Sequence, residues 1–128
     1  MIISEALKSC MEEINSPHDL LSAYSDGKRH FIDIDIEGSL EGADLSGIIF
    51  QKCFLLCDFE GANLEGARFE NSNIKTCTFR KANLKNAVIT KCAVECIDCV
   101  GANIENTIFD GNYYMGSVME QDDILGFC

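Results

Sequence analysis

The sequence predicts an all-β repeat fold, because apolar residues recur every five positions through most of the chain. With 47% of the residues apolar, thirteen consecutive hits at one phase would arise by chance with a probability of roughly 5 × 10⁻⁵. A period of five matches neither the helical period of 3.6 nor the strand period of 2. The positions of this series are Phe59, Leu64, Phe69, Ile74, Phe79, Leu84, Ile89, Val94, Cys99, Ile104, Phe109, Tyr114 and Met119.

Small side chains form a second series, two positions before the first. Alanine, cysteine, serine or threonine occupies nearly all of these positions, and the exceptions are Ile97 and Asn112. The repeating unit is therefore a small residue, a polar residue and a large apolar residue, followed by two variable residues. One small and one large side chain per unit can fill a narrow dry interior, while the other three residues face water.

The repeating unit resembles the A-(D/N)-L-x-x motif of pentapeptide repeat proteins in three segments, Ala62-Asn63-Leu64, Ala82-Asn83-Leu84 and Ala102-Asn103-Ile104. The resemblance covers roughly residues 31–119. It implies a right-handed quadrilateral β-helix in which four pentapeptides make one coil, with a short N-terminal helical cap. Coils of this kind stack as parallel strands about 4.8 Å apart, and their stability comes from stacking.

The phase of the apolar series changes before Phe59. The step from Leu55 to Phe59 is four residues long, which indicates a deletion at a corner near Leu56. A second four-residue step, from Ile36 to Leu40, extends the series back to Phe31. Counting four inward positions per coil then stacks like residues on like over a little under five coils. One column holds Phe31, Phe50, Phe69, Ile89 and Phe109, and another holds Leu45, Leu64, Leu84 and Ile104.

Residues 1–30 are predicted to form a helical leader that plugs the first coil. An amphipathic helix is expected over about residues 3–14, where Ile3, Leu7, Cys10 or Met11, and Ile14 recur on one face. A second helix is expected to begin at Ser16, with Pro17 at its first position and Asp19 in a capping-box-like arrangement, and to end before Gly27. Its apolar side is predicted to be Leu20, Leu21 and Tyr24.

Residues 120–128 are predicted to form a C-terminal tail. Ile124, Leu125 and Phe127 could fold over the last coil as a cap, or bury against the same end of a second copy. In several members of the resembled family the C-terminal coil forms the dimer contact, so a homodimer through this end is an open alternative.

Composition limits the class of protein. A chain of 128 residues is one domain. Residues 1–11 lack the basic start and long apolar stretch of a signal peptide, so we expect a cytoplasmic protein. The net charge of −11 argues against nucleic acid and anionic membranes as partners.

The eight cysteines are predicted to be free thiols, mostly used for packing. Inward positions of the repeat are occupied by Cys53, Cys57, Cys77, Cys92 and Cys99, where a thiol behaves as a small apolar group. Cys92, Cys96 and Cys99 have zinc-like spacings, but the repeat places Cys96 outside and the other two inside. We therefore expect no metal and no cofactor, and the roles of Cys10, Cys96 and Cys128 stay open.

No catalytic residues are predicted. The only histidines, His18 and His30, lie in the leader, and no serine, cysteine or carboxylate is placed with a base at a recognisable spacing. Asp33, Asp35 and Glu37 share one side of a strand, but a filled interior offers no cleft to desolvate them.

Two outward surfaces are candidates for binding a partner. A basic belt, without an acidic residue between Glu70 and Glu95, contains Lys75, Arg80, Lys81, Lys85 and Lys91. It either pairs with acidic residues of neighbouring coils or contacts an acidic partner. The preferred docking surface is an apolar wall that contains Ile49, Val88 and Ile108 beside Arg68, with Tyr113 and Met115 near the end of the rod.

These observations predict a non-catalytic protein-binding scaffold whose partner is unknown. Some pentapeptide repeat proteins imitate duplex DNA and protect topoisomerases such as DNA gyrase, and the acidic composition favours this alternative only in part, because the basic belt interrupts the acidic surface. An immunity-type toxin antagonist is a second alternative, and a metal-binding or redox role is a third.

Overall fold

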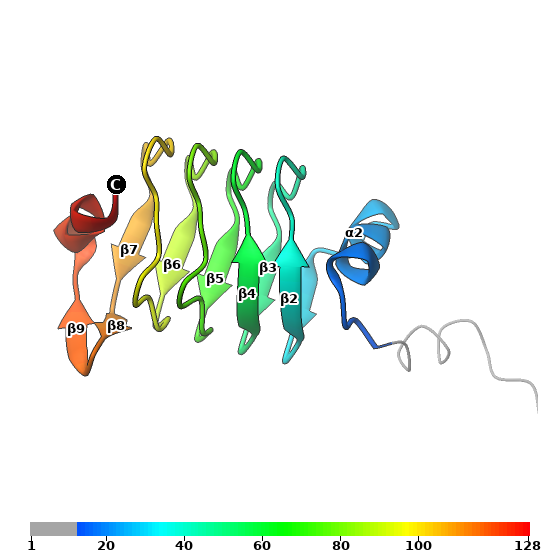
Figure 1. Cartoon of the computed structure of the whole chain (residues 1–128), viewed down its shortest axis with the longest axis horizontal. Helices are drawn as coiled ribbons and strands as arrows, with labels where there is room; N and C mark the ends of the chain where they lie inside the picture. The colour runs from blue at the N-terminus through cyan, green and yellow to red at the C-terminus, as the bar shows by residue number, and fades with distance from the viewer. Residues whose placement is uncertain (1–12) are drawn as a thin grey trace, which may run out of the picture.

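The computed structural model describes residues 13–128 as a rod of stacked coils with a helix at each end (Figure 1). Its elements are α2 (Pro17–Ser25), β1 (His30–Ile32), β2 (Asp35–Ser39), β3 (Ile49–Gln51), β4 (Phe54–Asp58), β5 (Arg68–Glu70), β6 (Val88–Thr90), β7 (Ile108–Asp110), β8 (Asn112–Tyr114), β9 (Ser117–Met119) and the 3₁₀ helix η1 (Gln121–Phe127). None of the helices in this part of the chain is long and apolar enough to cross a membrane.

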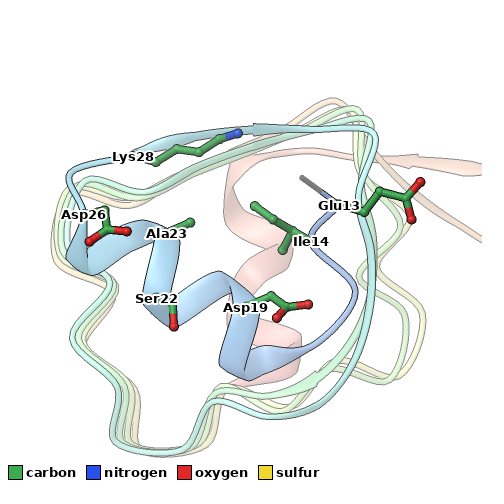
Figure 2. Close-up of a pocket in the computed structure, with 7 residues that line it drawn as sticks. All are labelled: Glu13, Ile14, Asp19, Ser22, Ala23, Asp26 and Lys28. Carbon is green, nitrogen blue, oxygen red and sulfur yellow. The ribbon is translucent and has the colours of Figure 1, made fainter. Parts of the chain in front are cut away.

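One wall of the rod is a five-stranded parallel sheet in the order β1-β3-β5-β6-β7. The register pairs Phe31 with Phe50, Phe50 with Phe69, Phe69 with Ile89, and Ile89 with Phe109. The predicted phenylalanine column is therefore confirmed, and it spans four complete turns of the coil. Figure 2 shows these coils stacked behind one another with a four-sided outline.

The predicted leucine column is also confirmed on the adjacent wall, although it is held by isolated bridges instead of a continuous sheet. The amides of Leu45, Leu64 and Leu84 donate to the carbonyls of Asn63, Asn83 and Asn103 on the next coil, at 2.8 Å in each case. The asparagine side chains continue this ladder outside, since the Asn83 amide donates to Asn63 Oδ1 at 3.3 Å.

Both predicted four-residue steps are present, and they lie side by side. β2 and β4 run straight for five residues where later coils turn a corner, and they pair in parallel from Asp35↔Phe54 to Ser39↔Asp58. The next coil restores the corner at Thr76, whose φ of 61° is left-handed. The segment around residues 31–36 is the first rung of the coil, because β1 and β2 pair with strands of the second coil.

The N-terminal plug is α2, which covers the first coil. Ser16 caps the helix by accepting the Asp19 amide at 3.1 Å, and the Asp19 carboxylate accepts the Asn15 amide at 3.0 Å. Leu20 is fully buried and the Tyr24 hydroxyl donates to the Ser46 carbonyl at 2.7 Å.

The leader differs from its predicted packing at Leu21. Leu21 was expected on the apolar side of the helix, but it is 37% exposed, whereas Leu20 is the residue that α2 buries. The predicted helix over residues 3–14 lies outside the described residues except at its end, where Glu13 and Ile14 are not helical.

At the C-terminal end the parallel path stops earlier than the predicted boundary at Met119. Tyr113 still bridges Ala93 in parallel, but Met115 and Gly116 adopt φ values of 48° and 85° and reverse the chain. β9 therefore pairs antiparallel with β8. The coil ends at Tyr114 because the next strand no longer advances along the rod.

η1 covers the last coil, which agrees with the predicted cap. Ile124 is 3% exposed, and the Phe127 ring lies 6.0 Å from the rings of both Phe109 and Tyr114. Leu125, which was expected to contribute to this cap, is 64% exposed.

Candidate functional surfaces

The interior of the rod is filled by side chains. Six phenylalanines lie fully buried along it, and the ring of Phe69 lies 5.3 to 5.9 Å from those of Phe50, Phe59 and Phe79. The buried Asn112 amide group is satisfied, since it accepts the Cys92 amide and donates to the Ile89 carbonyl, both at 2.9 Å. The outer surface is therefore the part of the described rod that can meet another molecule.

The five cysteines predicted to face inward are buried, and Cys96 is exposed as predicted. Their thiols do more than fill space. Cys77 Sγ donates to the Leu55 carbonyl at 3.2 Å and Cys92 Sγ to the Phe69 carbonyl at 3.2 Å, each on the preceding coil. Burial raises the pKa of Cys77 to about 11 and that of Cys92 to about 12, so these thiols are protonated at neutral pH.

The predicted docking wall is assembled as expected from its residues. Ile49, Arg68, Val88 and Ile108 stand next to one another in one column on the outer face of the five-stranded sheet. Ile108 is 49% exposed, whereas Ile49 and Val88 are half-buried. We call this column, Ile49 to Ile108, the sheet wall.

A polar network that the sequence did not reveal borders the sheet wall. Gln51 Nε2 donates to Glu70 Oε2 at 2.7 Å, Arg68 Nε donates to Glu70 Oε1 at 2.7 Å, and His30 Nε2 lies 2.6 Å from Gln51 Oε1. The hydrogen bonds from Gln51 and Arg68 lower the pKa of Glu70. Arg68 is therefore paired with Glu70 within the column instead of standing free as a cationic contact.

Most of the basic belt is paired with the next coil. The ion pairs are Lys75 Nζ to Glu95 Oε2 at 3.9 Å, Arg80 Nη1 to Asp98 Oδ2 at 3.0 Å, and Lys85 Nζ to Glu105 Oε2 at 3.8 Å. Lys81 and Lys91 occupy left-handed corners, with φ of 59° and 55°. The belt encircles the rod instead of forming one patch, which favours the pairing interpretation over a docking site for an acidic partner.

Tyr113 and Met115 lie together with Val118 at the C-terminal hairpin. Tyr113 faces Val118 across the β8–β9 pair, and the three side chains are 46%, 79% and 61% exposed in that order. Glu95 holds the turn in place, because its Oε1 accepts the Met115 amide at 2.7 Å and this hydrogen bond is the main cause of its lowered pKa.

A cavity of about 330 Å³ opens beside α2 and is drawn in Figure 2. Carboxylates of Glu13, Asp19 and Asp26 and the amine of Lys28 surround it. These groups have local tasks, since Asp19 caps the helix and Lys28 Nζ lies 5.3 Å from the centre of the Phe31 ring. The chain that precedes Glu13, next to this cavity, lies outside the described residues.

Among residues 13–128, side chains of types used in catalysis come together at the surface of α2. His18, Ser22 and Asp26 line one shallow hollow on α2, but the hydrogen bond that joins Ser22 and Asp26 in this part of the chain is a helix backbone bond, from the Asp26 amide to the Ser22 carbonyl at 3.0 Å. Within the same residues, no three His, Cys, Asp or Glu side chains gather as a metal site.

Residues 57–92 match the pentapeptide repeats family in eight copies. The structure is similar to that of alr5209, a pentapeptide repeat protein from Nostoc Pcc 7120, with a TM-score of 0.61 and 18% identity over 91% of this chain and 95% of that chain. It is also similar to QnrB1, a plasmid-mediated fluoroquinolone resistance protein, with a TM-score of 0.51 and 22% identity over 67% of this chain and 56% of that chain.

No curated protein sequence matches the chain. At these sequence identities, the two solved structures support the fold alone. The match to the repeats is a match of the amino-acid sequence. Residues 57–92 are therefore pentapeptide repeats, and the described chain has the β-helix fold of pentapeptide repeat proteins.

Proposed function

We propose that the protein is a non-catalytic, rigid scaffold that binds another protein through the sheet wall. The supporting observation is the outward column of the five-stranded sheet, in which Val88 and Ile108 are direct neighbours and Ile49 lies beyond Arg68. Exposed apolar groups that lie adjacent in one column mark a contact surface better than scattered ones do. Arg68, fixed by Glu70, supplies an oriented polar group in the middle of this column.

A co-precipitation experiment from native cell extract tests the proposal. Ile108→Lys places a charge on the sheet wall, and Val100→Lys is a matched control, because Val100 is 48% exposed and lies on another side of the rod. We expect the wild-type protein and Val100→Lys to retain one partner that Ile108→Lys loses. Equal recovery of every bound protein by Ile108→Lys would contradict the sheet wall as the docking surface.

A second candidate function is protection of a topoisomerase from quinolones. The similarity to QnrB1, described as a fluoroquinolone resistance protein, and the net charge of −11 favour it. The paired basic belt argues against a continuous phosphate-like surface along the rod. In a gyrase supercoiling assay with a quinolone, restoration of supercoiling by the protein at stoichiometric concentration would favour this function, and no effect would exclude it for gyrase.

We also propose that the hairpin end supports self-association. Tyr113, Met115 and Val118 form an exposed apolar group next to the unpaired outer edge of β9. Sedimentation velocity across a concentration series tests this. Dimerisation by the wild type that is lost in Met115→Lys would agree with the proposal, and a monomer at all concentrations would refute it.

A further inference from the structure

The side of the rod formed by β2 and β4 carries a second surface, which differs in chemistry from the sheet wall. In Figure 1 these two strands are the paired arrows next to α2, and later coils continue there as loops. The absence of a corner flattens both strands over five residues. A strand of five residues provides a flat face about 16 Å long.

Side chains alternate strictly along this face. Leu55 and Cys57 point into the core at 1% and 4% exposure, while Phe54 and Leu56 point outward at 42% and 40% exposure. A four-residue step places two consecutive outward positions on one straight strand, so the two apolar side chains stand next to each other. Elsewhere a corner would separate such positions.

Carboxylates on the neighbouring strand, β2, lie beside these two apolar side chains. The register sets Asp35 opposite Phe54 and Glu37 opposite Leu56, and both acidic residues are exposed. No ion pair within residues 13–128 involves either of them. Adjacent parallel strands lie about 4.8 Å apart, so each apolar side chain has an uncompensated carboxylate as its neighbour.

A groove continues this surface towards the third coil. It has a volume of about 430 Å³ and is lined by Glu37, Leu56 and Asp58, and by Thr76 and Thr78 from the restored corner. One Asp58 oxygen accepts the Glu60 amide at 2.8 Å, which fixes this carboxylate at the groove. The nearby cation Lys75 is engaged with Glu95.

We propose that the β2–β4 face is a docking site for a cationic, amphipathic segment of another protein. The apolar pair would bury the partner's aliphatic side chains, and the carboxylates of Asp35 and Glu37 would pair with its lysines or arginines. Charge complementarity selects this occupant, because a purely apolar segment would leave the carboxylates unpaired at the contact. A second copy of this acidic chain is disfavoured for the same reason.

Fluorescence anisotropy with three labelled heptapeptides tests the proposal at low salt. One peptide alternates leucine and lysine, one alternates leucine and glutamate, and one alternates serine and lysine. We expect the first peptide to bind at least tenfold more tightly than the other two. Equal binding of the serine–lysine peptide would reduce the effect to non-specific charge attraction and overturn the proposal.

Variants of the full chain locate the binding. Phe54→Thr with Leu56→Thr keeps residues that suit a strand, and we expect at least a tenfold loss of affinity for the leucine–lysine peptide. Asp35→Asn with Glu37→Gln should weaken it about fivefold, because exposed charge pairs contribute little individually. Ile108→Thr on the sheet wall is the control and should leave the affinity unchanged.

Other outcomes are also decisive. Unchanged affinity in the Phe54→Thr and Leu56→Thr double variant, with a melting temperature close to that of the wild type, would refute the site. Self-association lost in that variant would assign the face to a second copy and also overturn the proposal. This test does not involve the sheet wall. If the peptide does not bind the β2–β4 face, the proposed scaffold function is unaffected. If the sheet wall binds no partner, the proposal for the β2–β4 face is likewise unaffected.

Discussion

Phe69→Ala is the sharpest test of the filled interior. Phe69 is fully buried, and its ring contacts those of Phe50, Phe59 and Phe79 at centroid distances of 5.3, 5.9 and 5.6 Å. Truncating a buried phenylalanine to alanine costs about 3–5 kcal/mol in total, which includes the loss of its ring–ring contacts. Coils stacked on both sides cannot close around the gap, so we expect a loss of about 5 kcal/mol in the free energy of unfolding.

Urea unfolding followed by circular dichroism measures this loss. With a denaturant slope of about 2 kcal/mol per molar, the unfolding midpoint should fall by roughly 2.5 M. Phe54→Ala is the matched control, because it removes the same atoms from a side chain that is 42% exposed, and it should cost less than about 1 kcal/mol. Equal costs for the two substitutions would refute the close-packed interior.

Three further predictions concern single contacts. Burial raises the pKa of Cys77 to about 11 from its ordinary value of 9.0, so the thiol ionises first in the unfolded chain. The free energy of unfolding should therefore be unaffected below pH 9 and should fall between pH 9 and 11. Urea unfolding should show a shallower fall with pH in Cys77→Ala, and the same pH dependence in both proteins would contradict the reasoning. A Cβ at Gly38 would lie 2.9 Å from Pro17 Cγ, and the φ of Gly38 is 140°. Gly38→Ala should therefore loosen α2 at a cost of about 1–2 kcal/mol. Hydrogen exchange of the α2 amides should become faster, and unchanged exchange would argue against this contact. Glu95→Gln weakens the hydrogen bond to the Met115 amide, so exchange of that amide should accelerate severalfold, whereas equal protection in the variant would show that the turn holds without the charge.

The repeat itself could be predicted from the sequence because its constraint is local. Each coil needs a large and a small inward side chain, so the columns and both four-residue steps follow from spacing alone. The inward positions of Cys53, Cys57, Cys77, Cys92 and Cys99 follow for the same reason, and these five residues are buried as predicted. The five-residue period is sufficient to predict which side chains are buried wherever each coil follows the previous one along the rod.

The ends could not be predicted in the same way, because their structure depends on direction rather than period. Tyr114 and Met119 remain apolar and five residues apart on either side of a reversal, so the series does not register the change. The left-handed backbone at Met115 and Gly116 makes that reversal, and Glu95, twenty residues earlier, stabilises it. The hydrogen bonds of the thiols were missed because they link neighbouring coils, whereas the spacing specifies only side-chain size.

The two dissimilar caps have a consequence for how proteins of this design change in size. α2 closes the first coil, and the hairpin with η1 closes the last one, so neither cap depends on how many turns separate them. Duplicating or deleting one twenty-residue turn would change the length by about 4.8 Å while leaving both termini intact. The distance along the rod between two docking positions can therefore change during evolution only in steps of one turn.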